Sequence, residues 1–180
     1  MTKTIQISTR QQLDELSRKA DEAADVTCKR LQDLLNESLS GLQILHKLKF
    51  LPAGRSPLNS GDLNFIEQLN QTFTYLASFK AVEYLWAEHP NEDSFTVNLG
   101  TASGYDIHND AKTIVAEVFA AVTPSNNKKL KKDVEKVNKS KAEHKYVFYY
   151  CPGFEVGVIA PLDGYEDIKI ISLNLQLLTR

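Results

Sequence analysis

The sequence predicts an α/β protein in which helices flank a mixed central sheet, preceded by a helical arm. Apolar residues recur at helical spacing before residue 52 and again over 62–88, whereas later runs are short and β-prone. The 180 residues are 42% hydrophobic and 24% charged, which suits one globular domain with an extension. We therefore expect a helical arm and linker over residues 1–58 and an α/β core over residues 59–180.

The arm begins with a helix that Ser8 or Thr9 can cap, starting near Arg10. A stripe of leucines and small residues continues to Leu51, and Gly41 is expected to bend or interrupt the helix. Residues 55–61 are rich in Pro, Ser, Asn and Gly, as in a linker. Three roles remain open for this arm, namely packing on the core, pairing with a second copy, and contacting DNA.

A second helix is predicted over 62–88, ending before Pro90. Glu83 lies four residues after Phe79 and three before Trp86, so it shares their apolar stripe. Glu83 is therefore the candidate acid of this helix. The alternative is a carboxylate at the edge of the core with its head group in water.

The rest of the chain predicts the order strand, strand, strand, helix, strand, followed by one further strand near the C-terminus. The three strand-like runs cover residues 95–99, 105–109 and 113–122. A lysine-rich helix over 125–140, a strong strand over 145–151 and a β-rich run over 167–173 follow. Together with the helix over 62–88, this order predicts a mixed sheet with helices packed against it.

Two carboxylates in the second and third strands are the main candidates for chemistry. Glu117 interrupts an apolar strand, where a carboxylate is costly to bury unless it is paired, protonated or bound to metal. A two-residue turn at Asp110-Ala111 would place Asp106 opposite Val115. Asp106 and Glu117 would then share one face as diagonal neighbours. Such an oxygen-rich pair suits Mg²⁺, or Mn²⁺ as a substitute, better than zinc.

Charge and composition narrow the functional classes. The net charge of −2 argues against wholesale nucleic-acid binding, but lysines predominate over residues 128–145. That run indicates either a local phosphate-binding face or a solvated helix face. Without a long apolar run or an apolar leader, we expect a cytoplasmic protein with no membrane partner. Cys28 and Cys151 lack the spacing of a zinc site.

The segment Ser103-Gly104-Tyr105-Asp106-Ile107 resembles the approach to the first metal-binding aspartate in the PD-(D/E)xK nuclease superfamily. Glu117 is similar to the acid of the E-x-K that follows, and Glu83 to the glutamate that many members supply from the first core helix. The resemblance covers roughly residues 62–151. It implies a restriction-endonuclease-like core, α-β-β-β-α-β, in which the Val118 carbonyl completes the metal coordination.

One position departs from the family pattern, because Phe119 stands where the lysine of E-x-K is expected. Some members place the basic group on another element. Lys128, Lys132 and Lys136 follow one another at i, i+4 spacing in the predicted helix. We take Lys132 as the first choice, since it lies inside the helix near its beginning.

The resemblance implies a Mg²⁺-dependent DNA endonuclease, a hydrolase of phosphodiester bonds such as a restriction-type enzyme, with no organic cofactor. Asp106, Glu117, Glu83 and Lys132 would be catalytic, and the first three would bind the metal with Val118. A homodimer is expected because one chain carries one site. The alternatives are an inactive DNA-binding or assembly module of the same fold, and an interaction protein that works through its helical arm. DNA would be held by the lysine-rich helix, namely by Lys128, Lys129, Lys132 and Lys136.

Overall fold

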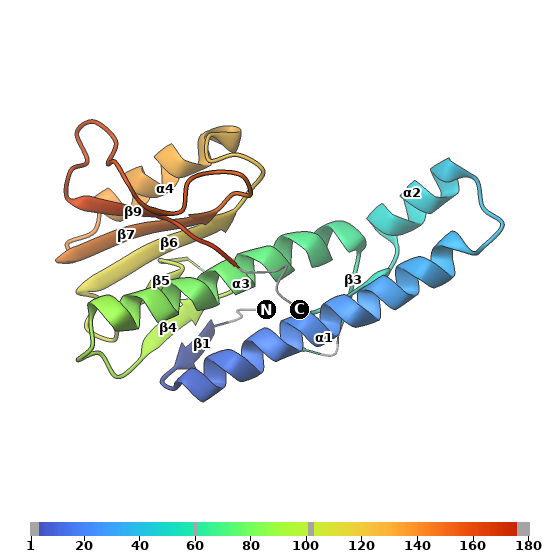
Figure 1. The fold of residues 1–180 in the computed structure, drawn as a ribbon, viewed down its shortest axis with the longest axis horizontal. Helices are drawn as coiled ribbons and strands as arrows, with labels where there is room; N and C mark the ends of the chain where they lie inside the picture. The colour runs from blue at the N-terminus through green and yellow to red at the C-terminus, as the bar shows by residue number, and fades with distance from the viewer. Residues whose placement is uncertain (1–3, 60, 101–102, 176–180) are drawn as a thin grey trace. The chain divides into compact units, whose positions relative to one another are not determined.

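A computed structural model describes residues 4–59, 61–100 and 103–175, and its chain divides into two compact units (Figure 1). One unit comprises Met1–Arg10 and Ala77–Arg180, and the other comprises Gln11–Leu76. The division therefore falls inside the second predicted helix and not at residue 58. It also assigns the first ten residues to the unit that contains the sheet.

The sheet unit is built on seven strands in the order β1-β4-β5-β6-β7-β9-β8. Neighbouring strands are antiparallel from β1 to β6, whereas β6–β7 and β7–β9 are parallel and β8–β9 is antiparallel. The strands are β1 (Thr4–Ile7), β4 (Phe95–Asn98), β5 (Ile107–His108), β6 (Ile114–Ala120), β7 (His144–Tyr150), β8 (Gly157–Ile159) and β9 (Ile168–Ser172).

The mixed α/β class and the order of the central elements are confirmed. Helix α3 (Phe65–Glu88) precedes β4, β5 and β6, and α4 (Lys129–Asn138) makes the crossover that the parallel pair β6–β7 requires. The edge strands β1 and β8 were not predicted. β1 is four residues long and pairs with β4, so it depends on a partner about 90 residues away in the chain.

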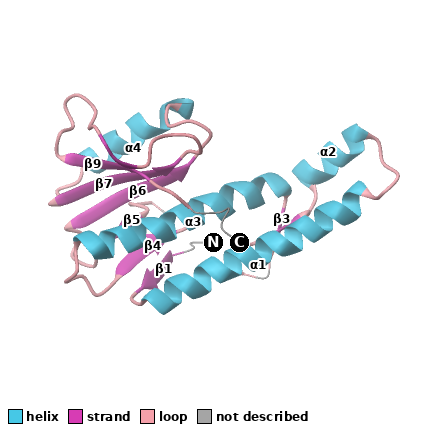
Figure 2. Ribbon diagram, in the orientation of Figure 1, coloured by secondary structure: helices cyan, strands magenta, loops and turns pink. Residues whose placement is uncertain are grey.

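The two faces of the sheet are covered by different helices. On one face α4 lies along β6, β7 and β9 (Figure 2), and its Val134 and Val137 pack into a cluster with Val115, Phe119 and Val147. On the opposite face the second half of α3 packs on alternate residues of β7. Its Tyr84 meets Tyr146 and Phe148 edge-on, with ring centroids 6.4 and 5.4 Å apart.

The arm unit contains α1 (Arg10–Leu35), α2 (Gly41–Phe50), the two-residue strands β2 (Gly54–Arg55) and β3 (Asp62–Leu63), and the first half of α3. The predicted long helix is thus two helices. The second begins with a capping box, in which the Ser40 side chain accepts from the Gln43 amide and the Gln43 side chain accepts from the Ser40 amide. No helix within the described ranges is long and apolar enough to cross a membrane.

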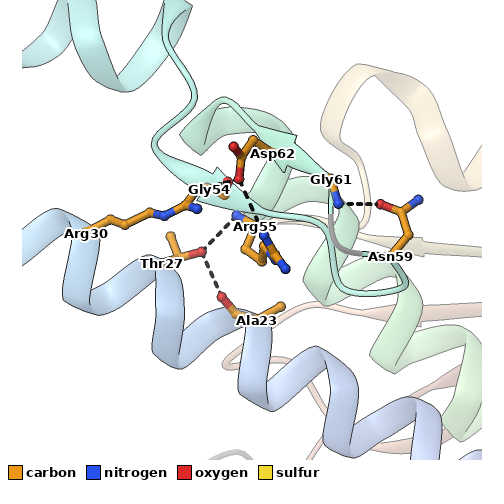
Figure 3. A network of polar contacts seen from close by, with 8 residues as sticks. All are labelled: Ala23, Thr27, Arg30, Gly54, Arg55, Asn59, Gly61 and Asp62. Carbon is orange, nitrogen blue, oxygen red and sulfur yellow. Dashed lines mark hydrogen bonds and ion pairs between the residues drawn. The ribbon is translucent and has the colours of Figure 1, made fainter.

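The residues predicted as a linker begin in β2 and lead to β3, which pairs with β2 in a hairpin (Figure 3). The buried hydroxyl of Thr27 accepts a hydrogen bond of 3.1 Å from the Arg55 amide. Arg30 donates to the Gly54 carbonyl at 2.9 Å and forms an ion pair of 2.8 Å with Asp62. These contacts tie the hairpin to α1, which composition alone does not reveal.

Candidate functional site

The two predicted carboxylates meet at the junction of β5 and β6. Ile107 pairs with Ala116 and His108 with Val115, so continuing the register places Asp106 opposite Glu117. The predicted register was wrong by two residues, because the connection is longer than a two-residue turn. A shift of two preserves the face on which a side chain lies, so the two acids still share one side of the sheet.

Glu117 is buried on the α4 face of the sheet, with only 2% of its surface exposed. Its Oε2 accepts a hydrogen bond of 2.8 Å from Lys136 Nζ, and its Oε1 lies 2.7 Å from the same nitrogen. Burial raises the pKa of Glu117 to about 7, the negative charge of Asp106 adds to the rise, and Lys136 opposes it. The carboxylate is therefore held by one ammonium group that is itself partly exposed.

Asp106 is fixed against β6 by the backbone. Its Oδ2 accepts a hydrogen bond of 2.8 Å from the Val118 amide. Burial raises the pKa of Asp106, while the Val118 amide and the charge of Lys136 act in the opposite direction. The amide and carbonyl of one strand residue face the same neighbouring strand, so the Val118 carbonyl is directed towards the segment that carries Asp106.

Asp106, Glu117 and a third acid, Asp133 of α4, form what we call the acidic cluster. Asp133 was not predicted from the sequence. It is 3% exposed, and its Oδ1 accepts from Lys129 Nζ at 2.7 Å. Burial raises the pKa of Asp133, the Lys129 hydrogen bond opposes the rise, and the charge of Asp106 adds to it. The spacing of Leu130, Val134 and Val137 places Asp133 on the inward stripe of the helix, which is the signal in the sequence that could have identified it.

Glu83 does not join these acids. It lies on α3, on the opposite face of the sheet, and forms an ion pair of 2.6 Å with Lys80. Glu83 lines a pocket of about 430 Å³ with Tyr84 and Ile171, away from Glu117. The Glu83 side chain is 41% exposed, as expected of the alternative, a carboxylate at the edge of the core, and α3 and α4 cover different faces of the sheet.

Lys136, and not Lys132, is the lysine that reaches Glu117. Lys132 is exposed one turn earlier in α4. Lys128 has a left-handed backbone (φ 55°) at the N-cap, so it lies outside the helical face that was predicted for it. Lys129, expected to bind DNA, instead pairs with Asp133. The helix begins four residues later than predicted, so Lys128 does not belong to the i, i+4 series of Lys132 and Lys136.

Aromatic rings border the cluster. Phe119 is buried and stacks on Tyr149 with ring centroids 5.7 Å apart. Lys129 Nζ lies 5.9 Å from the centroid of Phe119, and Lys136 Nζ lies 5.9 Å from that of Tyr105. Both ammonium groups thus combine a carboxylate contact with an aromatic one.

The oxygen donors of the cluster are of the kind that Mg²⁺ and Mn²⁺ prefer. Within the parts of the chain that the structure describes, no three His, Cys, Asp or Glu side chains are arranged to hold a metal ion as they stand. The Lys136 ammonium contacts both oxygens of Glu117, the position that a cation would need. Metal coordination by Glu117 would therefore require Lys136 to move.

Comparisons with known proteins add nothing to this geometry. No protein-family model matches the chain, no curated protein is significantly similar in sequence, and no solved structure is significantly similar in fold.

Proposed function

We propose that this chain is a divalent-metal-dependent endonuclease that hydrolyses phosphodiester bonds in DNA. The observation that carries the proposal is the contact of Lys136 with Glu117 beside Asp106. It supplies, from α4, the basic group that is absent at Phe119. The order α3-β4-β5-β6-α4-β7 adds support, because it is the order expected of the restriction-endonuclease-like core that the PD-(D/E)xK resemblance implies.

The donor chemistry of the site fits Mg²⁺ or Mn²⁺ held by Asp106, Glu117 and the Val118 carbonyl. A bound metal would stabilise charge on the scissile phosphate and lower the pKa of an attacking water. The amide of Val118 holds Asp106 in position. Lys136, released from Glu117, would neutralise phosphate charge and orient the water, since its side chain is 44% exposed.

DNA would approach from the lysine-rich start of α4. Lys128 and Lys132 are exposed there, next to the buried acids, and would hold phosphates without reading sequence. One chain carries one such site, so cutting both strands favours a homodimer. Sedimentation velocity with and without duplex DNA tests this, and a monomer in both conditions would contradict the dimer.

The test of the function is cleavage of plasmid and phage DNA in Mg²⁺ or Mn²⁺. We expect cleavage by the wild type, none in EDTA, and loss of at least about 100-fold in Asp106→Asn and Glu117→Gln. Glu135→Gln is the matched control, because it removes a carboxylate of α4 that forms only an exposed pair with Lys131. Equal cleavage by wild type and both site variants would refute the assignment, and binding without cleavage would favour the inactive module.

A second candidate function is supported by the exposed apolar face of α2. Leu42 is 79% exposed, and Leu45 and Phe50 are also exposed on this ten-residue helix. Such a face is typical of an interaction surface. If the arm alone carries the function, Leu42→Ser with Leu45→Ser will abolish partner binding while Asp106→Asn has no effect.

A further inference from the structure

The sheet face that carries Asp106 and Glu117 has two different halves. Over β6, β7 and β9 it is covered by α4. Over β1, β4 and β5 it presents polar side chains that are exposed or half-buried. Thr96 pairs with His108 and His108 with Val115, which packs against α4, so these polar side chains share the face of Glu117. The two acids therefore lie where the helix-covered half meets the polar half.

A pocket of about 120 Å³ lies on the polar half, next to Asp106 in the chain. The described residues that line it include no aspartate or glutamate. Pockets that enclose an organic ligand usually measure roughly 300–1,000 Å³, so this one suits a smaller group. Hydroxyl-bearing and basic side chains predominate in the lining, namely those of Thr4, Thr96, Ser103, Tyr105, His108 and Lys112. Size and lining together favour a small anion such as a phosphate group.

Two of these side chains have no acidic partner among the described residues. Lys112 is exposed in the turn before β6 and forms no ion pair there. The Nδ1 atom of His108 lies 3.0 Å from the Asn109 carbonyl, which can only accept a hydrogen bond. Nδ1 is therefore the donor, and Nε2 is left for a ligand. An ammonium group and hydroxyls are the donors that hold phosphates without reading sequence.

Tyr105 connects this pocket to the candidate site. It lines the pocket, and Lys136 Nζ, which contacts Glu117, lies 5.9 Å from the centroid of its ring. His108 follows Asp106 by two residues on the same face, which places their Cα atoms about 7 Å apart. A phosphate in the pocket and a phosphate at Asp106 can therefore belong to one polynucleotide strand.

We propose that the pocket holds a phosphate of the DNA strand that is cut at Asp106 and Glu117, at a position other than the scissile one. Lys112 supplies the charge and Thr96 a hydroxyl donor. The strand would then cross the face from the pocket, past the two acids, to the lysines at the start of α4. This inference rests on the proposed function and adds to it the residues that position the substrate.

The test is the affinity of the full chain for a fluorescein-labelled DNA duplex in EDTA, measured by anisotropy. We expect Lys112→Gln to weaken binding about tenfold and to reduce the slope of log K against log[salt] by about 1. Thr96→Val keeps the shape of the side chain but removes the hydroxyl, and it should weaken binding severalfold. Lys141→Gln is the matched control, because it removes the same charge at an exposed position outside the pocket. It should bind DNA as the wild type does.

Each other result overturns the phosphate pocket. Equal losses in Lys112→Gln and Lys141→Gln would show a general effect of charge. A loss in Lys112→Gln without one in Thr96→Val would place the phosphate outside the pocket. Calorimetric titration with inorganic phosphate is the remaining arm. Binding of that ion that depends on Lys112, with DNA binding that does not, would show a site for the free ion.

The outcomes also separate this inference from the proposed function. DNA binding that depends on Lys112 and Thr96, in a wild type that cuts no DNA in Mg²⁺ or Mn²⁺, supports the pocket and overturns the nuclease. Cleavage that requires Asp106, with DNA binding independent of Lys112 and Thr96, overturns the pocket alone. A wild type that neither binds nor cuts DNA overturns both.

Discussion

At the scale of single residues, the site depends on the identity of residue 119. Phe119 is packed between α4 and β7 and stacks on Tyr149, so this position belongs to the core. The basic group reaches Glu117 from Lys136, 19 residues away in the chain. The sequence points to Glu117 because a carboxylate in an apolar strand is costly to bury, and to Asp106 through the expected hairpin and the family resemblance. Lys136 was one of three candidate lysines, but Lys132 was preferred and Asp133 was missed, since these contacts depend on the rotation of α4 about its axis.

Restoring the family lysine by Phe119→Lys should therefore destabilise the protein. It removes a buried ring and buries a charge, which should lower the free energy of unfolding by roughly 4 kcal/mol. Urea unfolding measures the loss, with Phe154→Lys, at an exposed aromatic position, as the control. A stable Phe119→Lys protein that cuts DNA faster than wild type would show instead that the site had decayed.

His89 gives the sheet unit a dependence on pH. Its Nε2 lies 2.7 Å from the Tyr146 hydroxyl, and burial, together with the charge of His144, lowers the pKa of His89 below 6.5. Glu88 and Glu92 oppose the shift, and Lys169 adds to it. The unfolded chain then binds a proton that the folded chain resists, so the contribution of His89 to stability is complete above about pH 6.5 and is lost as the pH falls below it.

Thermal unfolding between pH 5 and 8 measures this dependence. His89→Gln should flatten the decline below pH 6.5, because the titrating group is gone. His46→Gln, at an exposed histidine of α2, should leave it unchanged. Identical profiles for wild type and His89→Gln would exclude His89 as the cause.

At the scale of elements, the connection between β5 and β6 sets the register of the two acids. Asn109 is 2% exposed, donates to Thr113 Oγ1 at 2.9 Å and accepts from the Ile114 amide at 3.1 Å. Lys112 has φ 55° and its amide donates to the Asn109 carbonyl. The sequence indicated a two-residue turn here. The hydrogen bonds of the Asn109 side chain instead close a connection that is two residues longer than predicted.

Asn109→Ala should lower the free energy of unfolding by about 2 kcal/mol, because two buried hydrogen bonds lose a partner. The looser register should also weaken Mn²⁺ binding. Chemical denaturation and Mn²⁺ titration measure the two effects, and Asp110→Ala, at an exposed position, is the control. Unchanged stability would mean that the strands set the register without Asn109.

At the scale of the whole molecule, hydrophobic periodicity sufficed to predict the α/β class and the central order of elements. The edge strands β1 and β8 were missed because they are only four and three residues long and each is stabilised by pairing with a strand already in the sheet. The boundary between the units was also missed, since α3 shows one continuous helical pattern across it. These features depend on contacts that no local pattern specifies.

The exposed lysines at the start of α4, Lys128 and Lys132, should dominate DNA binding, because the net charge of the whole chain is −2. Fluorescence anisotropy across a salt series should give a steep loss of affinity. Lys128→Gln with Lys132→Gln should reduce the slope of log K against log[salt] by roughly 2, with little change in sequence preference. A slope equal to that of the wild type would mean that DNA binds to a surface other than the one formed by Lys128 and Lys132.

If Lys136 acts with Asp106 and Glu117 in cleavage, its removal should lower the single-turnover rate at saturating DNA. We predict that Lys136→Met lowers this rate by at least about 100-fold. Lys132→Met should weaken binding only, and Lys139→Met, at an exposed residue where α4 ends, should have no effect. A wild-type rate in Lys136→Met, or a loss of rate confined to Lys132→Met, would contradict the account.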